Sequence, residues 1–236
     1  KDRISVEEID WSDNNQSLED IVSTTPGAPK ITYLYATTPK KFVTVGGRYG
    51  AQPILAEVGM NFYVEKVADN ADDRYYIHSW VNNPTTSQGT GNADYLGVEP
   101  LMDTDQRIEF TDSKGAPQKS IYLYVDRGIN NTHDDGTNSS PDRIKWHITP
   151  VGTDNGYKIY STWTDNLGGH SDNEKRNYYL SYYEGNPEEK PQKKFLVVTT
   201  DVTKAETFYF INIDDYRKVI NNQNKKYINV SGLVQD

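Results

Sequence analysis

The chain has 236 residues, with 25 basic and 34 acidic side chains and a formal net charge of −9 at pH 7. This length suits one domain of roughly 200 residues. The acidic balance argues against a nucleic-acid-binding surface, because phosphate contacts need clustered Lys and Arg. The absence of cysteine excludes a disulfide scaffold, a thiolate zinc site and a cysteine nucleophile. No run approaches 18 apolar residues, so we expect no transmembrane segment.

The first thirty residues differ in composition from the rest of the chain. Residues 1–30 are polar and acidic, and they close with the Pro- and Gly-rich run 24–29, which is typical of a turn or linker. We expect a tail or linker here, with a helix-like stretch at Leu18–Ile21; an ordered strap that packs through Trp11 is the alternative. A chain that starts at Lys1 without an apolar leader, and lacks cysteine, favours a secreted or surface protein of bacterial origin.

Short strands are expected from Ile31 onward. Runs of Tyr, Val, Ile, Thr and Phe alternate with Gly, Asn, Asp and Pro, and helical periodicity is nearly absent, which predicts an all-β fold. The expected strands are Ile31–Ala36, Phe42–Gly46, Ile54–Val58, Phe62–Val67, Tyr75–Val81, Tyr95–Glu99, Ile121–Asp126, Ile144–Thr149, Tyr157–Trp163, Tyr178–Tyr183, Phe195–Thr200 and Phe208–Ile213. Two further strands are expected at Tyr216–Ile220 and Tyr227–Val230.

An aromatic motif recurs three times among these strands. It reads Phe62-Tyr63-Val64, Trp146-His147-Ile148 and Phe208-Tyr209-Phe210. Because alternate residues of a strand face the same side, the first and third residues of each motif are expected to point inward. Each motif ends a unit of hairpin, third strand and aromatic fourth strand, and the units span about 31–67, 75–149 and 157–213.

Three such units predict a β-trefoil, with long loops in the second repeat. A six-stranded barrel closed by three hairpins removes most free sheet edges. We expect the trefoil to span 31–213. Residues 214–236 are then an extra hairpin or the start of a further repeat, unless this hairpin takes the first place in the trefoil and leaves 31–46 elsewhere.

The last hairpin also carries a resemblance to a known family. Its pattern is Asp215-Tyr216-Arg217, Asn221-Asn222 and Lys226-Tyr227-Ile228-Asn229-Val230-Ser231-Gly232. It resembles the start of a ricin B-type lectin repeat, and Trp146-His147-Ile148 lies where that family has its Gln-x-Trp strand. Gln-x-Trp itself occurs nowhere in the chain. The resemblance covers roughly 31–232 and implies a non-catalytic carbohydrate-binding module on a β-trefoil.

The resemblance also implies where a ligand would bind. In the family, a carboxylate on the second strand and an aromatic ring on the third hold the sugar. The corresponding second-strand residues, none of them Asp, are Thr44, Gly97, Ser181 and Asn229. On the third strand Tyr124 is the residue that could stack, with sheet packing as its alternative role. The predicted ligand-binding residues are therefore Tyr124, Asp126, Asn130 and Asn131 in the second repeat.

Other chemistry finds little support in the sequence. The four histidines lie on different elements without metal-ligand or general-base spacing, and the Asp-rich loop 126–142 is better explained by turn residues than by calcium. We expect no enzyme, no metal and no cofactor. The expected ligand is a glycan or a protein and not a nucleic acid. A protein-interaction or structural β-trefoil without sugar affinity is the alternative function, and the oligomeric state is left open.

Overall fold

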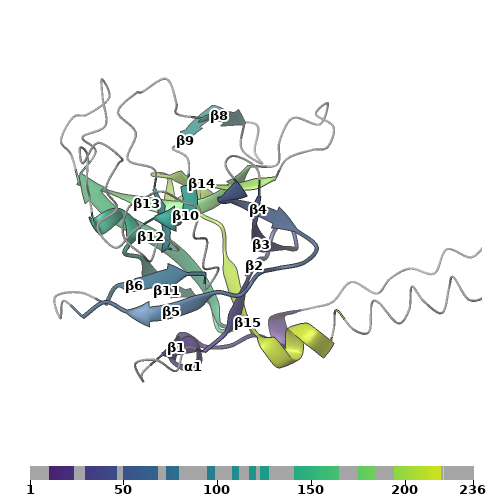
Figure 1. Cartoon of the computed structure of the whole chain (residues 1–236). Helices are drawn as coiled ribbons and strands as arrows, with labels where there is room; N and C mark the ends of the chain where they lie inside the picture. The colour runs from purple at the N-terminus through teal and green to yellow at the C-terminus, as the bar shows by residue number, and fades with distance from the viewer. Residues whose placement is uncertain are drawn as a thin grey trace, which may run out of the picture.

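Strands joined by turns form almost all of the regular structure in the computed structural model of the chain (Figure 1). Tyr, Val, Ile, Phe and Thr supply most of the strand residues, as their fit to a pleated, half-buried surface favours. The residues that the structure describes are 11–23, 30–46, 50–68, 73–79, 95–98, 108–111, 117–120, 123–127, 141–164, 175–183, 194–218 and 220. No helix among them is long and apolar enough to cross a lipid bilayer.

Each of the three predicted repeats supplies four strands in the same order. Repeat one contains β2 (Thr32–Ala36), β3 (Lys41–Gly46), β4 (Gln52–Ala56) and β5 (Tyr63–Lys66). Repeat two contains β6 (Tyr75–His78), β7 (Tyr95–Val98), β10 (Leu123–Arg127) and β11 (His147–Val151). Repeat three contains β12 (Gly156–Thr164), β13 (Lys175–Tyr183), β14 (Phe195–Thr199) and β15 (Phe208–Asn212).

Repeat two also holds a hairpin that the sequence did not predict. Its strands are β8 (Ile108–Thr111) and β9 (Pro117–Ser120), which pair only with each other. Figure 1 shows this hairpin beyond β4 and β14, at the end of the molecule opposite α1. Two short 3-10 helices, η4 (Pro141–Ile144) and η6 (Val202–Lys204), precede the fourth strands of repeats two and three.

The first and fourth strands of the repeats close into a six-stranded barrel. Antiparallel ladders join β5 to β6, β11 to β12 and β15 to β2, which link one repeat to the next. Within each repeat the first strand meets the fourth at a single residue pair. These pairs are Thr32 with Phe62, Tyr75 with Trp146 and Tyr157 with Phe208. The order β2, β5, β6, β11, β12, β15 and back to β2 is that of a β-trefoil, so the fold prediction is confirmed.

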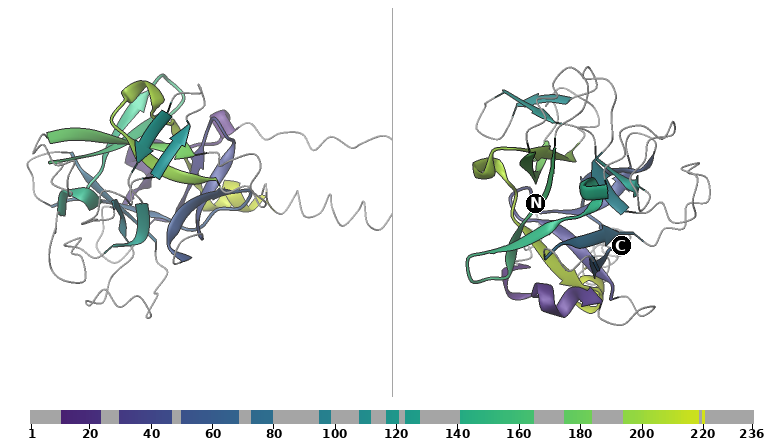
Figure 2. Two further views of the ribbon diagram at one scale, coloured as in Figure 1. Left: turned by 90° about the horizontal axis from the view of Figure 1, so that it is seen from above. Right: turned by 90° about the vertical axis from the view of Figure 1, so that its left-hand side faces the viewer.

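The three aromatic residues that define the repeats occupy equivalent places. Phe62, Trp146 and Phe208 each pair with the first strand of their own repeat, and all are at most 1% exposed. The remaining strands form three hairpins whose third strands meet around the quasi-threefold axis: β14 pairs with β4, and Val125 N on β10 donates to Ala51 O at 2.8 Å. Figure 2 shows the barrel from two further directions.

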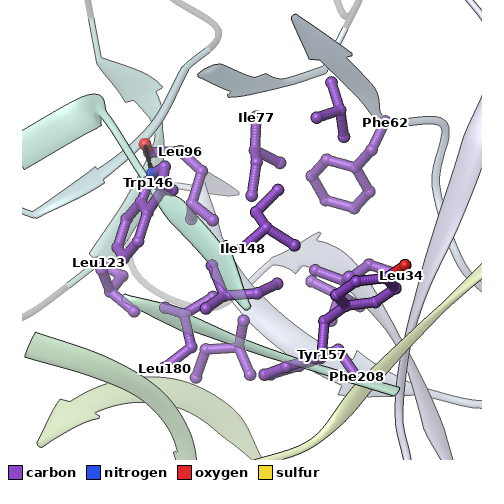
Figure 3. Close-up of a cluster of buried hydrophobic side chains, with 14 of the residues drawn as sticks. Leu34, Phe62, Ile77, Leu96, Leu123, Trp146, Ile148, Tyr157, Leu180 and Phe208 are labelled. Atoms are coloured by element: carbon purple, nitrogen blue, oxygen red, sulfur yellow. Dashed lines mark hydrogen bonds between the residues drawn. The ribbon is translucent and has the colours of Figure 1, made fainter. Parts of the chain in front are cut away.

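The core follows the same quasi-threefold symmetry, with equivalent buried residues in each repeat (Figure 3). Two positions after the paired residue, the first strands bury Leu34, Ile77 and Ile159, each 0% exposed. The second strands contribute Val43, Leu96 and Leu180 to the same cluster. Repeat two differs in one bond: Trp146 Nε1 donates to Leu96 O at 2.9 Å. The larger ring of Trp146 therefore satisfies a buried carbonyl that a phenyl group could not.

Residues 11–23 form an ordered strap on the barrel, which is the alternative that the sequence left open beside a tail. The strap contains η1 (Trp11–Asp13), α1 (Leu18–Ile21) and β1 (Val22–Ser23), and β1 pairs with β5. Ser17 caps α1 by accepting from Asp20 N, as N-cap serines do. Trp11 and Ile21 are buried; apolar burial of this kind stabilises the attachment.

The segment after β15 differs from its prediction. Residues 213–218 are helical, so the expected strand Tyr216–Ile220 is wrong. Asn212 explains the helix start, because its Oδ1 accepts from Asp215 N at 2.8 Å in an N-cap arrangement. Figures 1 and 2 show this helix at the same end of the barrel as the strap. The second expected strand, Tyr227–Val230, lies outside the described residues.

Candidate functional site

The residues predicted to bind a ligand are not brought together by the described part of the chain. Tyr124 lies on β10 opposite Gly97 and is 3% exposed, so its ring packs inside the sheet and offers no stacking face. Asp126 lies on β10 where the pairing register shifts, and its side chain is outside the described residues, as are Asn130 and Asn131. These four residues stay a prediction as a set.

Three rows of aromatic side chains cross the outer face of the barrel instead. Each row runs from the fourth strand of one repeat across the first strand to the second strand of the next repeat, through directly opposed residues. Row one is Tyr209, Tyr35 and Phe42. Row two is Tyr63, His78 and Tyr95. Row three is His147, Tyr160 and Tyr179.

The rows follow from strand alternation around the aromatic anchors. Tyr63, His147 and Tyr209 each come one residue after an inward-facing anchor, so they point outward. The first-strand members Tyr35, His78 and Tyr160 each come three residues after the residue that pairs with the anchor, so they too point outward. The rows are thus equivalent under the quasi-threefold axis. The tyrosine-rich strands signalled part of this pattern, but the second-strand members needed the register.

Row one is covered by the chain itself. The Trp11 ring centroid of the strap lies 6.0 Å from that of Tyr35 and 5.5 Å from that of Phe42. From the helix at 213–218, Tyr216 approaches Phe42 at 5.0 Å and stacks on Tyr33 at 3.7 Å. Tyr35 and Phe42 are consequently buried. Row one therefore packs aromatic side chains that come from segments outside the barrel strands.

Row three is the most open of the rows. The ring centroids of His147 and Tyr160 are 4.7 Å apart, and those of Tyr160 and Tyr179 are 4.9 Å apart. All three side chains are half-buried. Such cross-strand aromatic contacts hold the rings in fixed positions. The result is a continuous aromatic strip with one solvent-facing side.

Row two is intermediate between the other rows. Tyr63 is 5% exposed, and burial raises the pKa of its hydroxyl above the ordinary value. His78 and Tyr95 are half-buried. His78 Nε2 lies 3.4 Å from Glu65 Oε2, so a carboxylate borders this row. Both His78 and His147 lie on strands, as the sequence analysis favoured.

A short loop beside row one presents an exposed apolar side chain. Val58, in the connection from β4 to β5, is 53% exposed. The backbone around it is fixed: Gly59 N donates to the Tyr216 hydroxyl at 3.0 Å, and the Tyr33 hydroxyl donates to Asn61 Oδ1 at 2.6 Å. Val58 is therefore displayed on a held segment, which lowers the entropy cost of any contact it makes.

One buried carboxylate, Glu206, holds two strands together and is part of neither the aromatic rows nor the loop at Val58. Glu206 is 3% exposed, and its Oε1 accepts from Thr207 N at 2.7 Å, Thr38 Oγ1 at 3.0 Å and Thr37 Oγ1 at 3.1 Å. These bonds tie the start of β15 to the turn between β2 and β3. Burial raises the pKa of Glu206 above its ordinary value, although the hydrogen bonds oppose that shift. The described residues contain no group of three or more His, Asp or Glu side chains arranged to hold a metal ion.

Comparison with known proteins shows similarity to solved structures alone. The chain matches no protein-family model and no curated protein. It is similar to a chain of the complex of porcine pancreatic trypsin with soybean trypsin inhibitor, at 8% identity and a TM-score of 0.44, covering 78% of this chain and 92% of that one. It is also similar to a Kunitz-type cysteine protease inhibitor from potato, at 7% identity and a TM-score of 0.44, covering 84% of this chain and 98% of that one.

A third similar structure is a Caenorhabditis elegans protein of unknown function, at 8% identity and a TM-score of 0.42, covering 78% of this chain and 94% of that one. Likeness at this level assigns neither a family nor a function. None of the three similar structures is named as a ricin B-type lectin. The expectation of a carbohydrate-binding module is corrected, because Tyr124, the ring predicted to stack on a sugar, is 3% exposed.

Proposed function

We propose that this chain is a non-catalytic protein-interaction β-trefoil that binds a partner polypeptide on the outer face of its barrel. The observation that carries the proposal is the threefold recurrence of the aromatic rows. Row one packs Trp11 from η1 of the strap and Tyr216 from the helix at 213–218, two segments outside the barrel strands. Row three repeats the same construction and keeps its rings half-exposed. A surface that binds polypeptide in one repeat is thus present in another without being buried.

The chemistry of row three suits a protein interface. Tyrosine rings supply a large contact area with few rotatable bonds, so little side-chain entropy is lost on binding. Their hydroxyl edges tolerate water in the unbound state, whereas an apolar strip of the same size would promote aggregation. Aromatic residues are enriched at the centres of protein interfaces for these reasons.

The test uses a random linear peptide library displayed on phage, selected against the immobilised full chain. We expect enriched peptides that bind the wild type and lose binding to the double variant Tyr160→Thr/Tyr179→Thr. Threonine retains strand propensity, so the variant removes the rings without replacing them by poor strand formers. Thermal melting of both proteins checks that the fold is kept. Selection of no peptide that depends on row three would refute the proposal.

A second candidate function rests on the held loop at 57–61. An exposed apolar side chain on a pre-organised segment is what a peptidase inhibitor presents to its target. Here Val58 is exposed, while tyrosine hydroxyls bond the residues on its C-terminal side. Under this candidate the partner is a peptidase and the contact residue is Val58.

One set of assays separates the two candidates. Inhibition of an elastase-type serine peptidase, whose small S1 pocket suits a valine side chain, and of a cysteine peptidase is measured for the wild type, for Val58→Asp and for Tyr160→Thr/Tyr179→Thr. Loop-based inhibition should be lost in Val58→Asp and kept in the tyrosine variant. Peptide binding on row three should show the opposite dependence. If neither peptidase is inhibited at micromolar chain concentration, the second candidate falls and the first is unaffected.

A further inference from the structure

We propose that row three receives an acidic segment of a partner protein that carries an aromatic side chain; this inference rests on the proposed function and specifies its ligand. The geometry of row one shows how an aromatic side chain from another segment packs on such a row. The charges around row three show which chemistry it must have. Each point is independent of the other, because the first comes from ring contacts and the second from the composition of three strands.

The strands that carry row three are basic in an acidic protein. No Asp or Glu occurs in β11, β12 or β13, and Lys158 and Lys175 lie on the same strand faces as Tyr160 and Tyr179. The flanking carboxylates are already bound: Asp154 accepts from the Tyr209 hydroxyl, and Asp201 pairs with Lys204. The whole chain has a formal net charge of −9. A local field of the opposite sign favours an anionic partner and speeds its encounter with the surface. Row two lacks this character, since Glu65 lies beside His78.

The quasi-threefold axis identifies where the charge acts. In row one, Tyr33 follows Thr32 by one residue and stacks on Tyr216. The equivalent residue of repeat three is Lys158, which follows Tyr157 by one residue. Row one thus offers a ring where row three offers an ammonium group. Lys158 Nζ donates to Val202 O at 3.3 Å, and an ammonium has three donors, so it can also bind a carboxylate of the partner.

The segment that covers row one has the same combination of groups. Trp11 provides the ring that packs on the row, and Asp13 follows it within η1. In the sequence, Glu7, Glu8 and Asp10 precede Trp11. The described part of this segment thus packs one aromatic ring, Trp11, on row one, while the carboxylate of Asp13 stays exposed. The same stretch is the natural probe for row three.

The probe is a dye-labelled peptide with the sequence of residues 7–14, Glu-Glu-Ile-Asp-Trp-Ser-Asp-Asn. Its affinity for the full chain is measured by fluorescence anisotropy, beside a matched peptide with Gln and Asn in place of Glu and Asp. We expect the amide peptide and the Lys158→Glu variant each to weaken binding about fivefold at low salt, which corresponds to about 1 kcal/mol for an exposed charge pair. Added salt should reduce the difference in affinity between the two peptides and that between the wild type and Lys158→Glu.

Two further variants locate the binding. Lys66→Glu makes the same change in net charge, but it lies at the end of β5 beside Asp73; it should leave the affinity within about twofold, because screening limits the reach of exposed charges. Tyr160→Thr/Tyr179→Thr should abolish binding. Persistence of binding in that tyrosine variant would show that the peptide displaces the strap on row one, and would overturn the inference.

The remaining outcomes separate this inference from the proposed function. If both peptides bind equally, and Lys158→Glu changes nothing while the tyrosine variant abolishes binding, row three binds polypeptide without a charge preference and only this inference falls. If neither peptide binds and the phage selection also finds no ligand, the proposed function falls with it. A dimer in sedimentation equilibrium that dissociates in the tyrosine variant would make a second copy the occupant and overturn the inference.

Discussion

Replacing Trp146 with Phe tests whether the three repeats are energetically as well as geometrically related. The other repeats have Phe at this place, so the variant makes all three alike. It should nevertheless destabilise the fold, because Leu96 O then loses the indole N–H that donates to it at 2.9 Å. Trp163 is a matched control: it is also buried, and its Nε1 has no hydrogen-bond partner among the described residues.

The expected magnitudes follow from this difference. Leaving one buried carbonyl without a donor costs about 1–3 kcal/mol, and the smaller ring adds a packing loss that both substitutions share. Trp163→Phe keeps a ring against Tyr178, whose centroid is 3.9 Å away, and beneath Arg143, whose Cζ is 4.6 Å from the indole centroid. It also removes a buried donor that has no acceptor among the described residues. We therefore expect Trp146→Phe to lower the free energy of unfolding by about 1–3 kcal/mol more than Trp163→Phe.

Urea denaturation followed by far-UV circular dichroism gives both free energies of unfolding. Equal slopes with respect to urea concentration would show that the two variants unfold from comparable states. The reasoning would be refuted if Trp163→Phe cost as much as Trp146→Phe or more. Trp146→Ala should lower the free energy of unfolding by about 3–5 kcal/mol. A loss of this size would show that the position lies in the core even if Trp146→Phe has only a small effect.

Further predictions concern the carboxylate, the held loop and the strap. Burial raises the pKa of Glu206 in the folded state above its ordinary value of 4.5. The contribution of this group to the free energy of unfolding is therefore fully present below pH 4.5, and it is lost as pH rises through the folded-state pKa. Urea titrations at several pH values should show Glu206→Gln gaining stability relative to wild type as pH rises; a constant difference would contradict this. Gly59→Ala would place a Cβ 3.0 Å from both Phe42 Cβ and Tyr33 Cδ1 and should destabilise by about 1–3 kcal/mol, seen as a lower melting temperature, whereas an unchanged one would argue against the close packing. Trp11→Ala should lower the free energy of unfolding by about 3 kcal/mol, and a loss below about 1 kcal/mol would mean that the strap contributes little.

The threefold repeat could be predicted because it produces patterns that are local in the sequence. Large aromatics at Phe62, Trp146 and Phe208 are followed by alternating strands, and alternation decides which side chains face the core. The β8–β9 hairpin was not predicted although β8 alternates apolar and polar residues as Ile-Glu-Phe-Thr, because its partner β9 reads Pro-Gln-Lys-Ser and lacks any strand signature. A strand is predicted at Tyr216–Ile220 because Tyr, Val and Ile favour strands, whereas the bond from Asp215 N to Asn212 Oδ1 starts a helix at 213.

The candidate site was harder to predict than the fold. Tyr124 was singled out by its residue type, whereas its burial depends on strands that are distant in sequence. The aromatic rows require the register between three strands at once, and that register places Tyr179 opposite Tyr160 and Tyr160 opposite His147. Residue types were visible in the sequence, but their adjacency was set by pairing. Sequence patterns therefore indicated the anchors of the surface and not the surface itself.

The seam between β15 and β2 has a consequence for how the chain is made. Five residue pairs join these strands, and Gln16 of the strap also bridges to Phe210 on β15. Both β2 and the strap therefore need the last repeat to complete their pairing. During synthesis, β2 leaves the ribosome long before its partner exists, and contacts so far apart in sequence form slowly. The nascent polypeptide must wait for its final strand, and until then the unpaired edge of β2 is open to wrong partners.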